Sequence, residues 1–146
     1  MRSRPRCLSH SASRFHVVDL AKPHLLEPVA LLGAGPIGLL ILQVLKVAGA
    51  GEVHVIEPLA HRRAAALGLG AMAVFPTADE FVSGPGKVGR PLVIEATNSP
   101  FGFRDAVRPS RIGGRVVLAG IPDGDAYTLP PRLRAGAASR PSSSDD

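Results

Sequence analysis

The 146-residue chain has room for one ordinary domain with its own core. Its residues are 45% hydrophobic but only 4% aromatic, with no Trp, so a core of Val, Leu, Ile and Ala is expected, as in parallel α/β sheets. The net charge of +5 lies mostly in the first 28 residues, whereas residues 29–129 are nearly neutral, which argues against a basic groove for nucleic acid.

The first 27 residues show no helical or strand periodicity, and we expect an irregular N-terminal segment. The opening residues are rich in Arg and Ser and contain no acid before Asp19. That composition fits an organellar targeting peptide or, the simpler interpretation that we favour, a frayed or wrongly assigned start. The only cysteine, Cys7, excludes an internal disulfide framework and fits a reducing compartment, and we expect the protein in the cytoplasm.

A glycine turn of the form Gly-x-Gly-x-x-Gly follows, between an expected strand at Val29–Leu32 and an expected helix at Pro36–Ala48. Each glycine has a separate task. Gly33 permits the tight turn, Gly35 lets the backbone approach a pyrophosphate because it has no Cβ, and Gly38 lets the helix lie close to the sheet. The free amides and positive dipole end of that helix would face the phosphates, and a proline in its first turn leaves no donor unpaired.

The same region is apolar enough to resemble a membrane span. Gln43 and Lys46 interrupt residues 29–50, however, and three glycines and a proline occupy the first third. A buried strand, turn and helix explain this pattern better than a helix in a bilayer, so no membrane partner is expected.

The rest of the chain alternates between strand and helix patterns. Further strands are expected at Val53–Glu57, Ala71–Phe75, Leu92–Ala96 and Gly114–Ala119, and helices at His61–Leu69 and Phe101–Arg108. Asp79 is expected to cap a brief turn before the Gly84-Pro-Gly86 loop. Repeated βαβ units predict an α/β fold, a doubly wound parallel sheet of about five strands, which is the Rossmann fold. We assign residues 28–129 to this dinucleotide-binding domain and expect disorder in the polar tail 130–146.

A carboxylate ends the second expected strand. Glu57 lies nineteen residues after Gly38, where an acidic residue accepts hydrogen bonds from the adenosine ribose. A carboxylate there repels a 2′-phosphate, so NAD is expected in preference to NADP. Arg62 and Arg63 leave an alternative open, because their guanidinium groups either receive that phosphate or form a solvated helix start.

Five motifs, in order, carry a family resemblance. They are the stretch Val29–Leu40 with its glycine turn, Glu57 with Arg62, and the segments Leu67–Ala71, Val93–Pro100 and Gly113–Pro122. From Glu27 to about Leu129 the chain resembles the cofactor domain of the zinc-dependent medium-chain alcohol and polyol dehydrogenases, nearest to sorbitol and threonine dehydrogenases.

The resemblance implies a set of cofactor-binding residues. Pro36 and Ile37 join the three glycines, Glu57 and Arg62, while Thr97 with Gly120 and Ile121 approaches the nicotinamide side at the ends of the fourth and fifth strands. Asn98 stands where the family usually has Gly, and Asn tolerates a left-handed backbone.

The resemblance also implies a zinc-binding catalytic domain, and nothing in this sequence matches it. There is no Gly-His-Glu motif and no second cysteine, and the five histidines lack the paired spacing of a metal site. His54 is expected to be packed in a strand, and His61 to face solvent at a helix start. We therefore expect neither metal ligands nor catalytic residues in this chain.

The family's sixth strand is missing too, because the sequence turns into the polar tail where that strand would follow. This would leave the fifth strand as an open edge, a route to self-association. We interpret the chain as the NAD(H)-binding domain of a truncated alcohol or polyol dehydrogenase-like oxidoreductase, inactive by itself. The alternatives are a stand-alone, non-catalytic NAD(H)-binding module and a degenerate remnant. A short-chain dehydrogenase is disfavoured because Tyr127, the only tyrosine, has no lysine partner.

Overall fold

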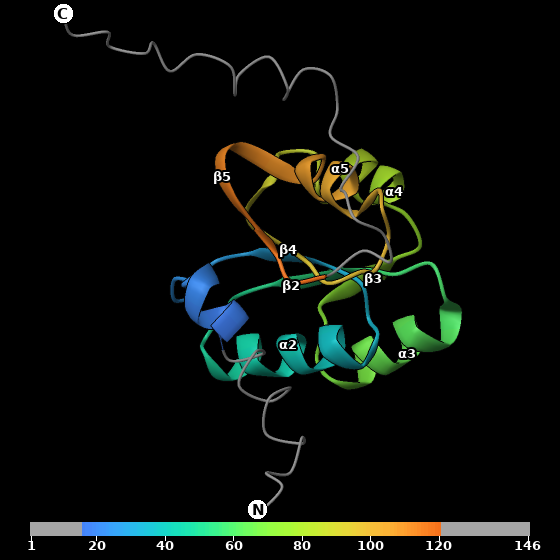
Figure 1. Cartoon of the computed structure of the whole chain (residues 1–146), viewed down its shortest axis with the longest axis horizontal. Coiled ribbons are helices and arrows are strands. Elements are labelled where there is room, and N and C mark those ends of the chain that lie inside the picture. The colour runs from blue at the N-terminus through green and yellow to red at the C-terminus, as the bar shows by residue number, and fades with distance from the viewer. Residues whose placement is uncertain (1–15, 121–146) are drawn as a thin grey trace, which may run out of the picture.

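A single sheet of parallel strands forms the centre of the computed structural model, which describes residues 16–120 (Figure 1). The strands are β1 (Val29–Leu32), β2 (Val53–Ile56), β3 (Ala73–Phe75), β4 (Arg90–Glu95) and β5 (Ser110–Leu118). Their order is β3-β2-β1-β4-β5, and every neighbouring pair is parallel. The winding therefore reverses between β1 and β4, which confirms the doubly wound α/β fold and places a crevice where those two strands end.

Helices cover both faces of this sheet. They are α2 (Pro36–Val47), α3 (Ala60–Gly68), α4 (Ala78–Ser83) and α5 (Gly102–Val107). Figure 1 shows α2 and α3 on one face and α4 and α5 on the other. This two-sided cover explains why the central strands are buried along their whole length and read as continuous apolar runs.

Alternate strand residues enter two separate cores. Val29 and Leu31 of β1 belong to the larger core, which includes Ile41 of α2 and consists of aliphatic side chains. Ala30 belongs to the smaller core, which is built around the fully buried Phe81 of α4. The aliphatic filling expected from the composition is thus confirmed, with one phenylalanine as the centre of the second face.

The structure differs from the expected irregular segment before residue 28. Residues 16–21 are helical, and Val18 and Ala21 are buried in the larger core. Arg115 of β5 fastens this segment, because its Nη1 donates to the carbonyl oxygen of Ala21 at 2.6 Å and its Nη2 to the Glu27 carboxylate at 2.6 Å. Six helical residues with two buried side chains are too few to produce a periodic sequence signal.

Several element boundaries differ from expectation by one to four residues, and two differences at element starts have a clear physical reason. Strand β5 begins at Ser110 because Ser110 pairs with Arg90 ahead of an irregularity in the β4–β5 register. Thr77 caps α4, accepting a bond from the Glu80 amide at 3.2 Å, so the expectation that Asp79 is the cap was wrong. Asp79 lies in the first turn of α4, where a carboxylate favours the helix dipole.

Strand β5 lies at one edge of the described sheet, and the self-association expected there stays a prediction. Among residues 16–120, no helix is both long and apolar enough to cross a membrane. Ile121, Tyr127 and the tail 130–146 lie outside the described residues.

Candidate functional site

A cleft of about 500 Å³ opens at the carboxyl ends of β1, β2 and β4. It is lined by Gly33, Gly35, Pro36, Ile37, Glu57, Pro58, Leu59, Arg62, Ala96, Thr97, Asn98 and Ser99. Seven of the ten residues predicted to bind the cofactor are in this lining. Gly38 is buried behind it, and Gly120 follows β5. The structure therefore brings together residues that are up to about sixty positions apart in the sequence.

The glycine turn is shaped by two positions that leave no room for a side chain. Gly33 has φ +93°, and a Cβ there would lie 2.8 Å from the carbonyl oxygen of Ala96. A Cβ on Gly38 would overlap the carbonyl oxygen of Gly33. Both contacts press the start of α2 against the ends of β1 and β4, as the sequence predicted.

The third glycine, Gly35, is not crowded in this way. It is the N-cap of α2, no side chain caps that helix, and Pro36 occupies its first turn. The nearest atom to a Cβ built on Gly35 is Nη1 of Arg62, at 3.7 Å. The first-turn amides of a helix have no partners within the helix, so this opening is suited to an anionic group such as a diphosphate.

Glu57 borders the other side of the opening and is almost fully buried. Its Oε2 accepts a hydrogen bond from the Ala34 amide at 2.8 Å, and its Oε1 accepts one from the Leu59 amide at 3.0 Å. One carboxylate thus connects the glycine turn to the loop after β2. This connection fixes the carboxylate beside the N-terminus of α2.

The structure separates the roles of the two neighbouring arginines. Arg63 Nη1 donates to the main-chain oxygens of Glu57, at 2.8 Å, and Pro58, at 2.6 Å, so it supports the loop. Arg62 lines the cleft, half-exposed, with Nη1 4.0 Å from Glu57 Oε2. Of these two arginines, Arg62 is therefore the one whose side chain lines the cleft.

The β4–α5 loop forms the third wall. Thr97 and Asn98 line the cleft, and Asn98 is exposed. The non-glycine residues with positive φ in the described chain are Lys22 and Leu26, so Asn98 does not use the left-handed backbone that Asn tolerates. Asn98 fits because this turn does not require a glycine conformation.

Glu95, the last residue of β4, lies behind this wall, and sequence reasoning missed it. It has no exposed surface, and its Oε1 accepts a hydrogen bond from the Thr97 amide at 2.7 Å. Burial raises the pKa of Glu95 above its ordinary value, while hydrogen bonds from Thr97 and Gly120 partly oppose the shift. A carboxyl at the end of the apolar run Leu92–Ile94 was the available signal.

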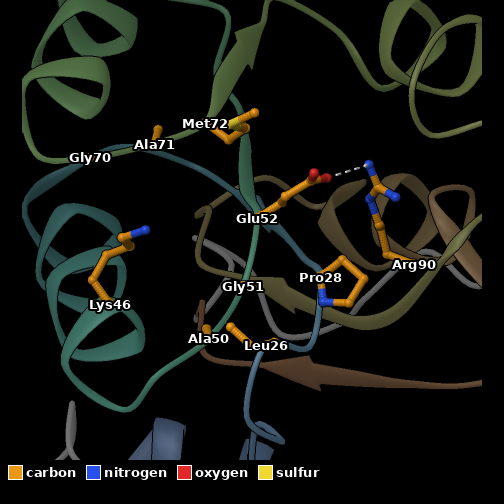
Figure 2. Close-up of a pocket in the computed structure, with 10 residues that line it drawn as sticks. All are labelled: Leu26, Pro28, Lys46, Ala50, Gly51, Glu52, Gly70, Ala71, Met72 and Arg90. Atoms are coloured by element: carbon orange, nitrogen blue, oxygen red, sulfur yellow. Dashed lines mark ion pairs between the residues drawn. The ribbon is translucent and has the colours of Figure 1, made fainter.

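A larger hollow of about 760 Å³ lies at the opposite edge, before the strands begin (Figure 2). Leu26, Pro28 and Met72 contribute apolar surface to it. Arg90 Nη2 lies 4.0 Å from Glu52 Oε2 across this hollow. This hollow lies beside the C-terminal end of α2, so the free amides at the start of that helix, which attract an anion, do not face it.

The histidines match their expected environments. His54 is buried in β2, with Nδ1 3.4 Å from Arg90 Nη2, and its ring centroid is 5.5 Å from that of Phe81. His61 is exposed in the first turn of α3. Residues 16–120 contain no group of three or more His, Cys, Asp or Glu side chains able to hold a metal ion. The described residues therefore do not fit a zinc site.

Comparison with known proteins agrees with this geometry. The model of the zinc-binding dehydrogenase family matches residues 36–137. The chain is 32% identical over 115 residues to (R,R)-butanediol dehydrogenase of Bacillus subtilis, covering 76% of this chain and 33% of that enzyme. It is 33% identical over 104 residues to L-threonine 3-dehydrogenase of Caldanaerobacter subterraneus, covering 68% of this chain and 30% of that enzyme. The chain thus spans about a third of the length of these relatives.

Solved structures show the same fold. The 2R,3R-butanediol dehydrogenase of Bacillus subtilis matches with a TM-score of 0.73 and 30% identity, over 84% of this chain and 36% of that chain. A zinc-binding dehydrogenase of Sinorhizobium meliloti bound to NADP matches with a TM-score of 0.73 and 33% identity, over 83% of this chain and 38% of that chain. The chain belongs to the zinc-dependent medium-chain alcohol dehydrogenase family and covers its dinucleotide-binding region.

Proposed function

We propose that this chain binds NAD(H) in the cleft formed by the glycine turn, Glu57 and the β4–α5 loop. The main support for this proposal is the position of the Glu57 carboxylate. The Ala34 and Leu59 amides hold it beside the start of α2, which no side chain caps. A diphosphate at the helix start would place the adenosine ribose next to this carboxylate, which accepts hydrogen bonds from the ribose hydroxyls.

The choice between NAD and NADP depends on Glu57 and Arg62. A 2′-phosphate would lie against the Glu57 carboxylate and be repelled by it, and the two amides already bound to that carboxylate hold it in place. Arg62 Nη1 is 4.0 Å from the same carboxylate, close enough to offset part of this repulsion. The fixed acid outweighs the half-exposed cation, because surface ion pairs contribute little, and we propose NAD as the cofactor.

Titration of the full chain with NADH and with NADPH tests both statements. Nicotinamide fluorescence and the shift in melting temperature report binding, and we expect tighter binding of NADH. Glu57→Ala should weaken NADH binding by about tenfold or more, equivalent to about 1.4 kcal/mol, and narrow the difference between the cofactors. Glu80→Ala, at an exposed acid of α4, is the matched control. Tighter NADPH binding would overturn the NAD preference, and absence of binding in a folded chain would overturn the function.

Hydride transfer to or from an alcohol is the activity that we propose for the protein to which this cofactor-binding region belongs. Two similar enzymes are named for butanediol and for L-threonine. Because the described residues contain no group able to hold zinc, the proposal assigns to residues 16–120 only the binding and orientation of the dinucleotide. NAD reduction by 2,3-butanediol or L-threonine would show turnover, whereas NADH binding without turnover of either would favour a non-catalytic binding module.

A further inference from the structure

Glu95 is a buried acid that dinucleotide binding at the glycine turn does not use. Its Oε1 accepts a hydrogen bond from the Thr97 amide at 2.7 Å and also contacts the Thr97 hydroxyl. The Ser99 amide in turn donates to the Thr97 hydroxyl at 3.3 Å. One carboxyl oxygen thus organises the β4–α5 loop at the cleft wall.

Two glycines allow the carboxyl to fit. A Cβ on Gly102, at the start of α5, would lie 2.5 Å from Glu95 Oε1, and a Cβ on Gly120 would lie 2.8 Å from Oε2. A Cβ on Gly120 would also overlap the Thr97 carbonyl oxygen. The Glu95 side chain therefore fills the space between the β4–α5 loop, the start of α5 and the segment after β5.

The main chain of the same residue holds the end of β5. The carbonyl oxygen of Glu95 accepts hydrogen bonds from the Ala119 amide at 2.7 Å and the Gly120 amide at 2.9 Å. Side chain and main chain of Glu95 together fix Thr97 and Gly120 relative to one another. These are the two described residues predicted to approach the nicotinamide side.

We propose that Glu95 is the positioning residue of the nicotinamide half of the cleft: it locks the β4–α5 loop against the end of β5 and so sets where the nicotinamide ribose and ring dock. The inference rests on the proposed function, because it concerns the same cofactor. In this proposal Glu57 binds the adenosine end of the cofactor, and Glu95 positions the loop that contacts the nicotinamide end.

The surroundings of the Glu95 carboxyl shift its equilibrium toward the neutral form. Burial raises the pKa of Glu95, and the hydrogen bonds from Thr97 and Gly120 only partly lower it again. The charged groups on the neighbouring helices are paired elsewhere, Arg104 with Asp105 on α5 and Arg108 with Asp79 on α4. On β5, Arg115 is bound to Glu27, and at the end of β2 Glu57 is bound by amides and near Arg62.

The sign of the pH effect follows from this shift. Because folding raises the pKa above the ordinary value of 4.5, the folded chain holds a proton that the unfolded chain has lost. Stability contributed by this proton is present below pH 4.5 and declines as pH rises toward the folded pKa.

The test compares NADH with ADP-ribose, which has the same adenosine and diphosphate but no nicotinamide. Calorimetric titration of the full chain gives both dissociation constants for wild type, Glu95→Ala, Glu95→Gln and Thr97→Val. We expect Glu95→Ala and Thr97→Val to weaken NADH binding about tenfold, with ADP-ribose affinity unchanged. Glu95→Gln, a neutral isostere that keeps an oxygen able to accept the Thr97 amide, should keep NADH affinity.

Each outcome is decisive. Equal losses for NADH and ADP-ribose in the variants would show a general structural role and overturn the inference, while leaving the proposed function intact. A wild-type chain that binds neither compound would overturn both. If Glu95→Ala does not fold, Thr97→Val and Glu95→Gln decide, since each removes a hydroxyl or an ionisable group without opening a large cavity. Glu80→Gln is the control for loss of an acid.

Discussion

The carboxyl and amino edges of the sheet both contain acidic residues, but they differ in which charged groups are buried there. At the carboxyl edge the acids Glu57 and Glu95 are buried and receive backbone amides, and the helix α2 begins. At the amino edge the acid Glu52 is more than half-exposed, the buried group is the cation Arg90, and α2 ends near Lys46 (Figure 2). The direction of parallel strands and helices thus decides which edge can hold an anionic cofactor.

The largest expected difference between the two edges comes from two glycines that are similarly crowded, one at each edge. A Cβ on Gly38 would overlap the Gly33 carbonyl oxygen at the carboxyl edge, and a Cβ on Gly51 would overlap the Leu26 carbonyl oxygen at the amino edge. Gly38→Val and Gly51→Val should each lower the free energy of unfolding by about 1–3 kcal/mol through overpacking. Only Gly38→Val should abolish NADH binding, because it displaces the start of α2.

Chemical denaturation gives the stability of both variants, and titration below the unfolding transition gives NADH affinity. Comparable loss of affinity in Gly51→Val would mean that the two edges are coupled. Unchanged affinity in a folded Gly38→Val would contradict the role of the α2 N-terminus.

Replacement of Arg90 should have the next largest effect, and that effect should be on the free energy of unfolding alone. Its guanidinium carbon lies 5.4 Å from the centroid of the Phe81 ring, while no group in residues 16–120 accepts a hydrogen bond from its Nε. A buried charge with incomplete partners contributes little net stability, so the packed side-chain stem is the main stabilising part. Arg90→Ala should cost about 2 kcal/mol, and Arg90→Met should recover most of that.

Neither Arg90 variant should change the Kd for NADH. Equal destabilisation by Ala and Met would show that the charge itself stabilises the fold. Weaker NADH binding in Arg90→Met, with stability retained, would contradict the separation of the two edges.

His54 should make the amino edge sensitive to acid. Burial lowers the pKa of His54, as does the positive charge of Arg90, while Glu52 opposes the shift. The unfolded chain therefore takes up a proton at higher pH than the folded chain, and stability falls as pH decreases through the ordinary value of 6.5. This loss of stability as pH falls is opposite in sign to the effect of Glu95, whose contribution to stability declines as pH rises.

Urea denaturation between about pH 5 and about pH 8 measures the effect. His54→Phe keeps a ring beside Phe75 and Phe81 and should flatten the curve. Arg90→Met should reduce its slope. A pH dependence that is unchanged in His54→Phe would assign the decline to another group.

The contrast between the edges also explains what could be predicted from the sequence. The run Val29–Leu32 and its glycine turn are local patterns, so β1 was predicted with its observed bounds and the start of α2 at Pro36. Glu57 was found because its spacing from the turn is a local motif. Arg90 gave no such signal, and Glu95 gave only that of an acid ending an apolar run. The roles of both depend on strands that meet only in the folded sheet, β4 with β5 and β2 with β4 across β1.

The smallest expected effect comes from Gly68, the last residue of α3. A Cβ built there meets no atom within 4 Å, in contrast to Gly38 and Gly51. Gly68→Ala should raise the free energy of unfolding by about 0.5–1 kcal/mol, because alanine restricts the unfolded chain and favours the helix. NADH affinity should not change, since this helix end lies away from the cleft. A loss of stability in Gly68→Ala would mean that α3 needs glycine at its end. It would also mean that an uncrowded glycine can be as sensitive to substitution as the crowded Gly38 and Gly51.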